Sequence, residues 1–145
     1  MSTLPTFTDG EGHATLSGLP PGRMRVVALG SNLVPGYSDI EEILEGRETA
    51  IIVTMGRGPR VKVRIENRSG KVVVGAKLSA RWRSGPWIPI SLVQRFDSKT
   101  GYLDLGHLPP VAVEFRVHSP AAKPFLVQRT LPSGSSVELV FTTPK

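Results

Sequence analysis

The chain contains an internal repeat, and this repeat constrains the fold more than any other feature. Residues 9–21 are echoed by residues 98–110, and an offset of 89 relates Gly12 to Gly101 as it relates the Leu-Pro-Pro turns that follow them. The same offset aligns apolar residues further along the chain: Val26 with Phe115, Ala28 with Val117 and Ile51 with Val140. A fixed period of this kind indicates two copies of one structural unit.

The second copy, residues 56–145, has the pattern of a complete all-β module. Apolar residues at 61, 63 and 65 alternate with charged ones, and a second alternation places Ala76, Leu78, Ala80 and Trp82 on one face of a strand. Further strands are predicted near Ile88–Phe96, Gly101–Leu105, Val111–Val117, Phe125–Thr130 and Ser136–Thr142. Short strands separated by Gly, Pro and Ser clusters are typical of a β-sandwich.

The first copy, residues 1–55, is predicted to be a partial module truncated at its N-terminal side. Subtracting the offset from Val61 gives a position before Met1, so about three strands have no counterpart in this chain. The segments with strand patterns are Ala14–Leu19, Arg23–Leu29, Tyr37–Leu44 and Thr49–Met55. Residues 40, 43 and 44 also have helical spacing behind Ser38, but so short a helix is marginal and an irregular or strand conformation is favoured.

Composition excludes several classes of protein. The 15 glycines and 13 prolines fall between apolar runs, as strand punctuation does. Absence of cysteine excludes disulfides, thiolate nucleophiles and cysteine zinc sites, and it leaves the compartment open. No apolar run approaches the roughly 20 residues that span a bilayer, and the first twelve residues lack the features of a signal peptide, so we expect no membrane insertion.

Candidate catalytic and metal-binding residues are sparse. His13, His107 and His118 show neither metal-ligand spacing nor pairing with a nucleophile, so we expect ordinary surface or edge histidines, no enzyme activity and no cofactor. Asp9 and Asp97 stand beside turn glycines, where carboxylates can bind calcium. The competing interpretation, which we favour, is that each accepts hydrogen bonds from its own backbone.

Basic residues give the stronger functional signal. Residues 1–55 carry three arginines against seven carboxylates, a net charge of −4, whereas residues 56–145 carry fifteen basic and five acidic side chains, a net charge of +10. Five basic residues occupy outward positions of two strands that could share a sheet: Lys62, Arg64, Lys77, Arg81 and Arg83. Such a face would bind an acidic glycan or another polyanion. The competing interpretation, which we favour, is a solvated strand face that deters edge-to-edge aggregation.

Two tryptophans are expected to differ in role. Trp82 is in phase with the core, whereas Trp87 lies in a loop-like segment next to arginines. There it would stack on a sugar ring or base, or else cap the end of the sandwich. Aromatic residues make up only 6% of the chain, so nucleic acid is not favoured as a ligand.

Several motifs together resemble the carboxypeptidase regulatory-like, or transthyretin-like, β-sandwich domain. They are Thr8-Asp9-x-x-Gly12, Gly18-Leu19-Pro20-Pro21-Gly22, Arg25-Val26-Val27-Ala28 and Gly36-Tyr37, with the other half of the pattern in Val61–Ile65 and Ser69–Ala76. The second copy departs from the pattern at Val111, where the family has Gly. The resemblance implies tandem seven-stranded, immunoglobulin-like sandwiches without catalysis, found on secreted or surface proteins or beside a catalytic domain.

A related group, the collagen-adhesin B-type domains, can carry a Lys–Asn isopeptide bond. Asn32 and Asn67 are the only asparagines here, and neither lies in the final predicted strand, so we expect no cross-link.

Two functions of different class follow. The chain is a structural or assembly module whose incomplete first copy pairs with the second copy, with a neighbouring chain or within a homo-oligomer. The opposite charges of the two copies favour head-to-tail contact. The alternative is an accessory module that binds carbohydrate or another polyanion through its basic strand face.

Overall fold

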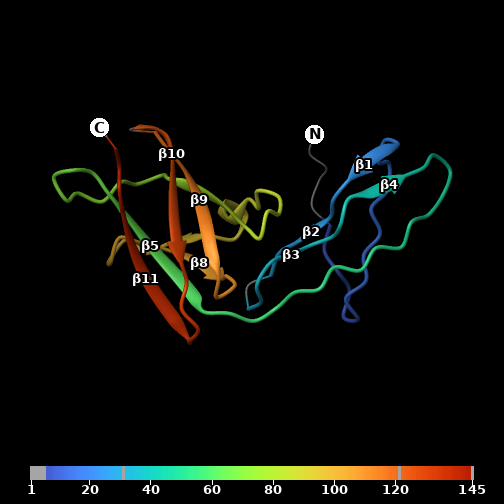
Figure 1. Ribbon diagram of the computed structural model, residues 1–145, viewed down its shortest axis with the longest axis horizontal. Coiled ribbons are helices and arrows are strands. Elements are labelled where there is room, and N and C mark those ends of the chain that lie inside the picture. The colour runs from blue at the N-terminus through green and yellow to red at the C-terminus, as the bar shows by residue number, and fades with distance from the viewer. Residues whose placement is uncertain (1–5, 31, 121, 145) are drawn as a thin grey trace.

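The computed structural model describes residues 6–30, 32–120 and 122–144, and these form an all-β protein. Residues 1–5, 31, 121 and 145 lie outside the described part. Figure 1 shows an elongated molecule with two parts, which we call the arm (residues 6–56) and the body (residues 57–144). The one helical element in the described ranges is a 3-10 turn, η1 (Ile90–Leu92), in the body. No helix among these residues is long and apolar enough to cross a membrane.

The body contains two sheets. One has the strand order β11-β5-β8-β7, from Ser136–Thr142, Arg60–Glu66, Tyr102–His107 and Arg95–Phe96, and here β11 runs parallel to β5 while the other neighbours are antiparallel. The other sheet is antiparallel with the order β10-β9-β6, from Ala122–Thr130, Ala112–Ser119 and Lys77–Trp82. Strand β5 is therefore paired on both of its edges.

A single hydrophobic core joins the two sheets. The predicted inward residues of β5 and β6 are buried: Val61, Val63, Ile65, Leu78, Ala80 and Trp82, with Ala76 just before β6. Phe115 of β9 and Phe141 of β11 come from different sheets, and their rings lie 5.2 Å apart between centroids. Burying one such side chain contributes roughly 1.5–3 kcal/mol. The period-2 alternation therefore predicted correctly which residues of β5 and β6 face the core.

The predicted strand at 88–96 is wrong over most of its length. Ile88 makes only an isolated bridge to Ala80, and η1 follows before the short strand β7. Pro89 has no N–H to donate and restricts the residue before it, so the chain leaves the sheet there. At this edge of β6 the side chain of Gln94 takes the place of a neighbouring strand, because its Nε2 donates to the Ala76 carbonyl just before β6 at 2.8 Å.

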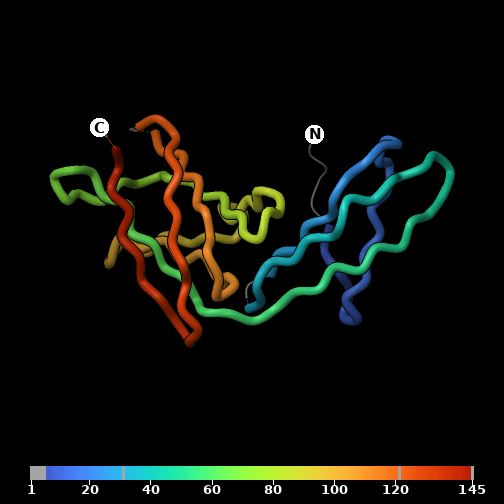
Figure 2. The backbone as a smooth tube through the Cα atoms, in the orientation of Figure 1, coloured from blue at the N-terminus to red at the C-terminus, as the bar shows by residue number. Residues whose placement is uncertain are grey.

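The arm is a narrow antiparallel ribbon (Figure 2). Strand β1 (Gly22–Met24) pairs with β4 (Glu41–Ile43), and β2 (Val27–Ala28) pairs with β3 (Gly36–Tyr37). Residues 40–44 contain strand β4 and no helix, which confirms the favoured conformation for that segment. The strands predicted at 14–19 and 49–55 are not formed.

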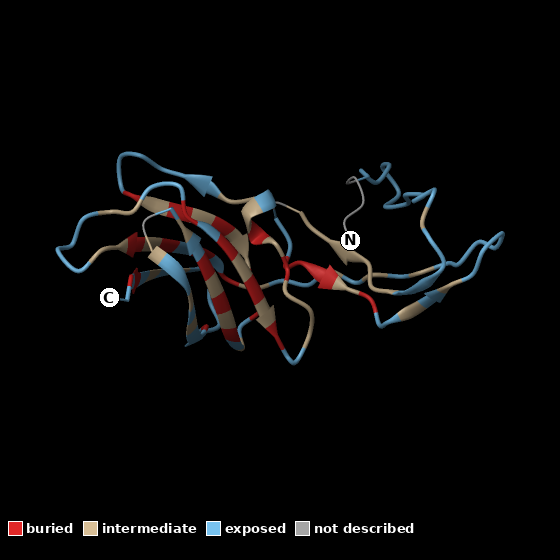
Figure 3. Cartoon of the chain, turned by 90° about the horizontal axis from the view of Figure 1, so that it is seen from above, coloured by how far each residue is buried: buried red, intermediate tan, exposed pale blue. Residues whose placement is uncertain are grey.

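The arm contacts the body through Val34 and Tyr37, with Val27 and Leu29 also packed against the core. Val34 is 5% exposed and belongs to the body's core cluster, and backbone hydrogen bonds in both directions join it to Gly56, the last residue of the arm. The Tyr37 ring lies 6.4 Å from the Trp82 ring and its hydroxyl donates to the Trp82 carbonyl at 3.5 Å. Figure 3 shows the buried segments in the body and at this junction, with the rest of the arm intermediate or exposed.

Hairpin β2–β3 of the arm and hairpin β9–β10 of the body share one register. In the arm, Val27 pairs with Tyr37 and Ala28 pairs with Gly36. Adding the sequence offset of 89 to each of these residues gives the pairs Arg116–Leu126 and Val117–Phe125, and both pairs are present between β9 and β10. Hairpin β2–β3 therefore occupies the position of β9–β10 in the repeat and is paired in the same way.

Candidate binding surfaces

The single basic face expected from the sequence is not formed, because its two strands belong to different sheets. Lys62 and Arg64 lie on β5 and Lys77 and Arg81 on β6, and these strands line opposite sides of one core. Their outward faces therefore point away from each other. Alternation indicates which residues of a strand face outward, but it does not indicate which sheet the strand joins.

Arg83 lies outside strand β6, which ends at Trp82. Its φ of 52° is left-handed, and the Gly85 N–H donates to the Trp82 carbonyl at 2.9 Å, so residues 83 and 84 form a tight turn. The outward strand position assigned to Arg83 is therefore wrong, although its side chain is exposed.

Acidic neighbours largely neutralise the basic residues of β5. Arg64 forms an ion pair with Glu66 at 2.8 Å. Asp104 of β8 forms an ion pair with Arg60 at 2.9 Å. Lys62 stands in register between Asp104 and Glu138 of β11, and cross-strand partners share one face of a sheet. The outward face of β5 therefore has the features of a solvated strand face, the competing interpretation of these basic residues.

The outward face of the three-stranded sheet carries a cluster that we call the Trp87 cluster: Trp87, Arg81 and Arg116. The guanidinium carbons of Arg81 and Arg116 lie 4.6 Å and 4.5 Å from the centre of the Trp87 ring. Arg81 is also paired with Glu114, with Nε 3.2 Å from Oε1. Within the described ranges, Nε of Arg116 is buried and has no hydrogen-bond partner. The cluster therefore retains positive charge next to a large aromatic ring.

Backbone pairing explains the position of Trp87. The Ile88 N–H donates to the Ala80 carbonyl at 2.7 Å and the Ala80 N–H donates back at 3.0 Å, so residue 88 faces inward and residue 87 faces outward beside β6. Trp87 thus lies on a sheet face, half-buried, and not at the end of the two-sheet unit. Arg116 was not among the basic residues predicted to face outward, although it alternates with the buried Val113, Phe115 and Val117 of β9.

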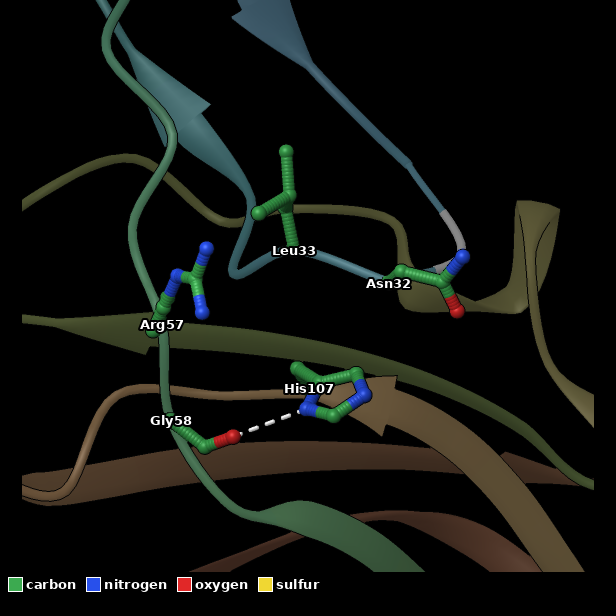
Figure 4. Close-up of a pocket in the computed structure, with 5 residues that line it drawn as sticks. All are labelled: Asn32, Leu33, Arg57, Gly58 and His107. Atoms are coloured by element: carbon green, nitrogen blue, oxygen red, sulfur yellow. Dashed lines mark hydrogen bonds between the residues drawn. The ribbon is translucent and has the colours of Figure 1, made fainter.

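A cavity of about 460 Å³ lies between arm and body, lined by Asn32, Leu33, Arg57, Gly58 and His107 (Figure 4). His107 Nδ1 is 2.7 Å from the Gly58 carbonyl oxygen. Because a carbonyl oxygen only accepts, Nδ1 carries the proton and donates it. His107 therefore fastens the segment that links arm and body. No group of three potential metal-ligating side chains occurs among the residues that the structure describes.

The two turn aspartates are engaged by their own backbone, as the favoured interpretation held. Asp9 Oδ1 accepts from the N–H groups of Glu11 and His13, both at 2.9 Å, and Asp97 Oδ1 accepts from the Lys99 N–H at 2.9 Å. The hydrogen bond from His13, and then that from Glu11, lowers the pKa of Asp9 from its ordinary value of 3.8.

The arm exposes apolar side chains whose repeat counterparts are buried in the body. Leu16 is 37% exposed and Ile52 is 89% exposed, whereas their counterparts at the offset of 89, Leu105 and Phe141, are each 1% exposed. Other large apolar residues of the arm are also exposed: Phe7, Leu33, Ile40 and Leu44. Both copies of the repeat therefore contain apolar residues at these two positions, but only the copies of these residues in the body are buried.

Comparison with known proteins identifies no relative: no family model, no curated protein and no solved structure matches this chain.

Proposed function

We propose that this chain is a non-catalytic structural and interaction module of a multi-domain or self-assembling protein. It consists of one complete transthyretin-like β-sandwich, residues 56–145, and one incomplete copy of the same module, residues 1–55. The common register of hairpins β2–β3 and β9–β10 supports the tandem relationship. The two sheets around one core support the sandwich assignment.

The observation that carries this proposal is the uncovered apolar side of the arm. Ile52 and Ile40, which both lie outside the short strands of the arm, are 89% and 52% exposed. An exposed apolar surface next to unpaired strand edges is typical of a site where another protein segment binds. The arm therefore serves as the contact through which the module joins a neighbouring module.

Light scattering during size exclusion tests this proposal at low and high salt and at several protein concentrations. We expect assemblies that Ile52→Asp dissociates, because a carboxylate in a buried contact is costly. The matched control is Val74→Asp, which places the same charge at a position of the body that is 65% exposed. A chain that stays monomeric in all conditions, or assemblies that Ile52→Asp leaves intact, would contradict an assembly role for the arm.

The Trp87 cluster supports a second candidate function, the binding of an acidic glycan or similar polyanion. Arg116 and Arg81 lie on the Trp87 ring, and Lys77 is an outward residue of the same sheet. Guanidinium groups bind sulfate and carboxylate groups through paired hydrogen bonds. Salt-dependent retention on heparin should fall in Arg116→Ala. The control, Arg64→Ala, removes one positive charge from the opposite sheet and should change retention less. Equal effects of the two substitutions would rule out the cluster as the site.

A further inference from the structure

Among the described residues, the arm has no counterpart of β5, which is paired on both edges in the body. In the body, β5 lies between β11 and β8 and is hydrogen-bonded to both. Subtracting the repeat offset places the counterpart of β11 at residues 47–53 and that of β8 at residues 13–18. Neither segment is assigned as strand, although both belong to the described part of the chain. The missing strands at these two places have one common explanation, because in the body both β11 and β8 depend on pairing with β5.

The side chains of these two segments agree with a vacant strand position. Ile52 is the counterpart of Phe141, and Leu16 is the counterpart of Leu105, and both counterparts face the core of the body. Residues 49–55 read Thr-Ala-Ile-Ile-Val-Thr-Met, a run of β-branched and apolar residues with high strand propensity. The segment therefore has the composition of a strand, but residues 49–55 form no strand ladder, although Val53 and Thr54 pack against Gly36 of β3.

We propose that the arm is the acceptor for a donated β-strand from a partner protein, inserted between residues 13–18 and residues 47–53. This inference rests on the repeat relationship of the proposed function. The pairing in the body sets the geometry: the donor runs parallel to residues 47–53, as β5 runs to β11, and antiparallel to residues 13–18, as β5 runs to β8. Backbone hydrogen bonds to both neighbours supply affinity, as in other cases of strand addition.

The chemistry of the donor follows from the same comparison. Every second residue of the donor strand must be apolar in order to cover Ile52 and Leu16. Strand β5 has this pattern, with Val61, Val63 and Ile65 buried in the body. Its outward residues are expected to be basic, because residues 1–55 carry a net charge of −4. Strand β5 of a second, intact copy does not qualify, since both of its edges are already paired. The partner is therefore a protein with a free extended segment of alternating apolar and basic residues.

A peptide with the sequence of residues 58–68, which spans β5, is a suitable probe for the full-length chain. Fluorescence anisotropy of the labelled peptide should show saturable binding, and hydrogen exchange should slow at residues 13–18 and 47–55. A control peptide carrying Val63→Asp, with the same length and nearly the same composition, should bind at least tenfold more weakly. Ile52→Asp in the chain should weaken binding of the original peptide by a similar factor, and Val74→Asp should leave it unchanged.

Three results would overturn the inference: no saturable binding, equal binding of the Val63→Asp peptide, or protection confined to the body. The last result would mean that the peptide exchanges with β5 in place of filling the arm. Failure of the inference is distinct from failure of the assembly role. Chains that assemble through Ile52 in light scattering and yet bind no peptide would retain the assembly role and refute strand donation.

Discussion

Replacing Gly58 with Ala should loosen the contact between arm and body at Val34. A Cβ at residue 58 would overlap the Leu108 carbonyl oxygen and would lie 3.1 Å from Val34 Cγ2. The oxygen belongs to backbone and cannot swing aside, and the Val34 side chain is itself buried in the junction. The linking segment must therefore move away from the body, which disturbs the His107–Gly58 hydrogen bond of 2.7 Å.

The expected cost follows from these contacts. Overpacking a filled site costs roughly 1–3 kcal/mol, and a disturbed hydrogen bond adds about 0.5–1.5 kcal/mol. For a chain of this size each kcal/mol lowers Tm by roughly 2–4 °C, so calorimetry should show a decrease of several degrees. The control is Gly56→Ala, where the nearest atom to a new Cβ is Val34 Cβ at 4.0 Å. If the two variants unfold at the same temperature, the close packing of residue 58 does not hold the junction together.

Three further predictions concern the core, the Trp87 cluster and a turn. Phe115→Ala removes a fully buried ring between the sheets and should cost about 3–5 kcal/mol in denaturant unfolding; a loss below 1 kcal/mol would contradict a shared core. Arg81→Ala removes a partly exposed ion pair and one contact with Trp87, so it should cost less than about 2 kcal/mol while shifting tryptophan fluorescence; unchanged emission would refute the contact. The pKa of Asp9 is lowered in the folded turn, so its carboxylate stabilises the turn at pH values above the unfolded pKa. This stabilisation is lost as the pH falls through the folded pKa, and an NMR titration of Asp9 should give a midpoint below 3.8. A midpoint at or above 3.8 would mean that the turn hydrogen bonds do not form.

The strands of the body could be predicted because each one encodes its inward face by alternation. Val61, Val63 and Ile65 are buried as their spacing indicated, and the same holds for Leu78 and Ala80. Alternation with a period of two residues is a local property of each strand, so a single sequence contains the information needed to predict its inward face. The all-β class and the core could both be predicted on this basis.

Sheet membership could not be predicted in the same way, and the candidate site changed for that reason. Lys62 and Arg81 have equivalent outward positions in their own strands, yet β5 and β6 belong to different sheets. Arg116 comes close to Trp87 only because β9 pairs with β6 and residue 88 bridges to Ala80. These are pairings between residues distant in sequence, and local patterning does not specify them.

The difference between arm and body shows how far the short arm strands depend on neighbours that the body has. The two copies share the register of hairpins β2–β3 and β9–β10 and several core positions, but the described arm contains no counterpart of β5 or β6. With β5, the segments on both of its edges form strands of six and seven residues, β8 and β11. In the arm their counterparts form no strand, and the hairpin strands are only two or three residues long. A two-stranded ribbon is marginal in water by itself, so the arm depends on its contacts at Val34 and Tyr37 and gains most from a partner that supplies the third strand.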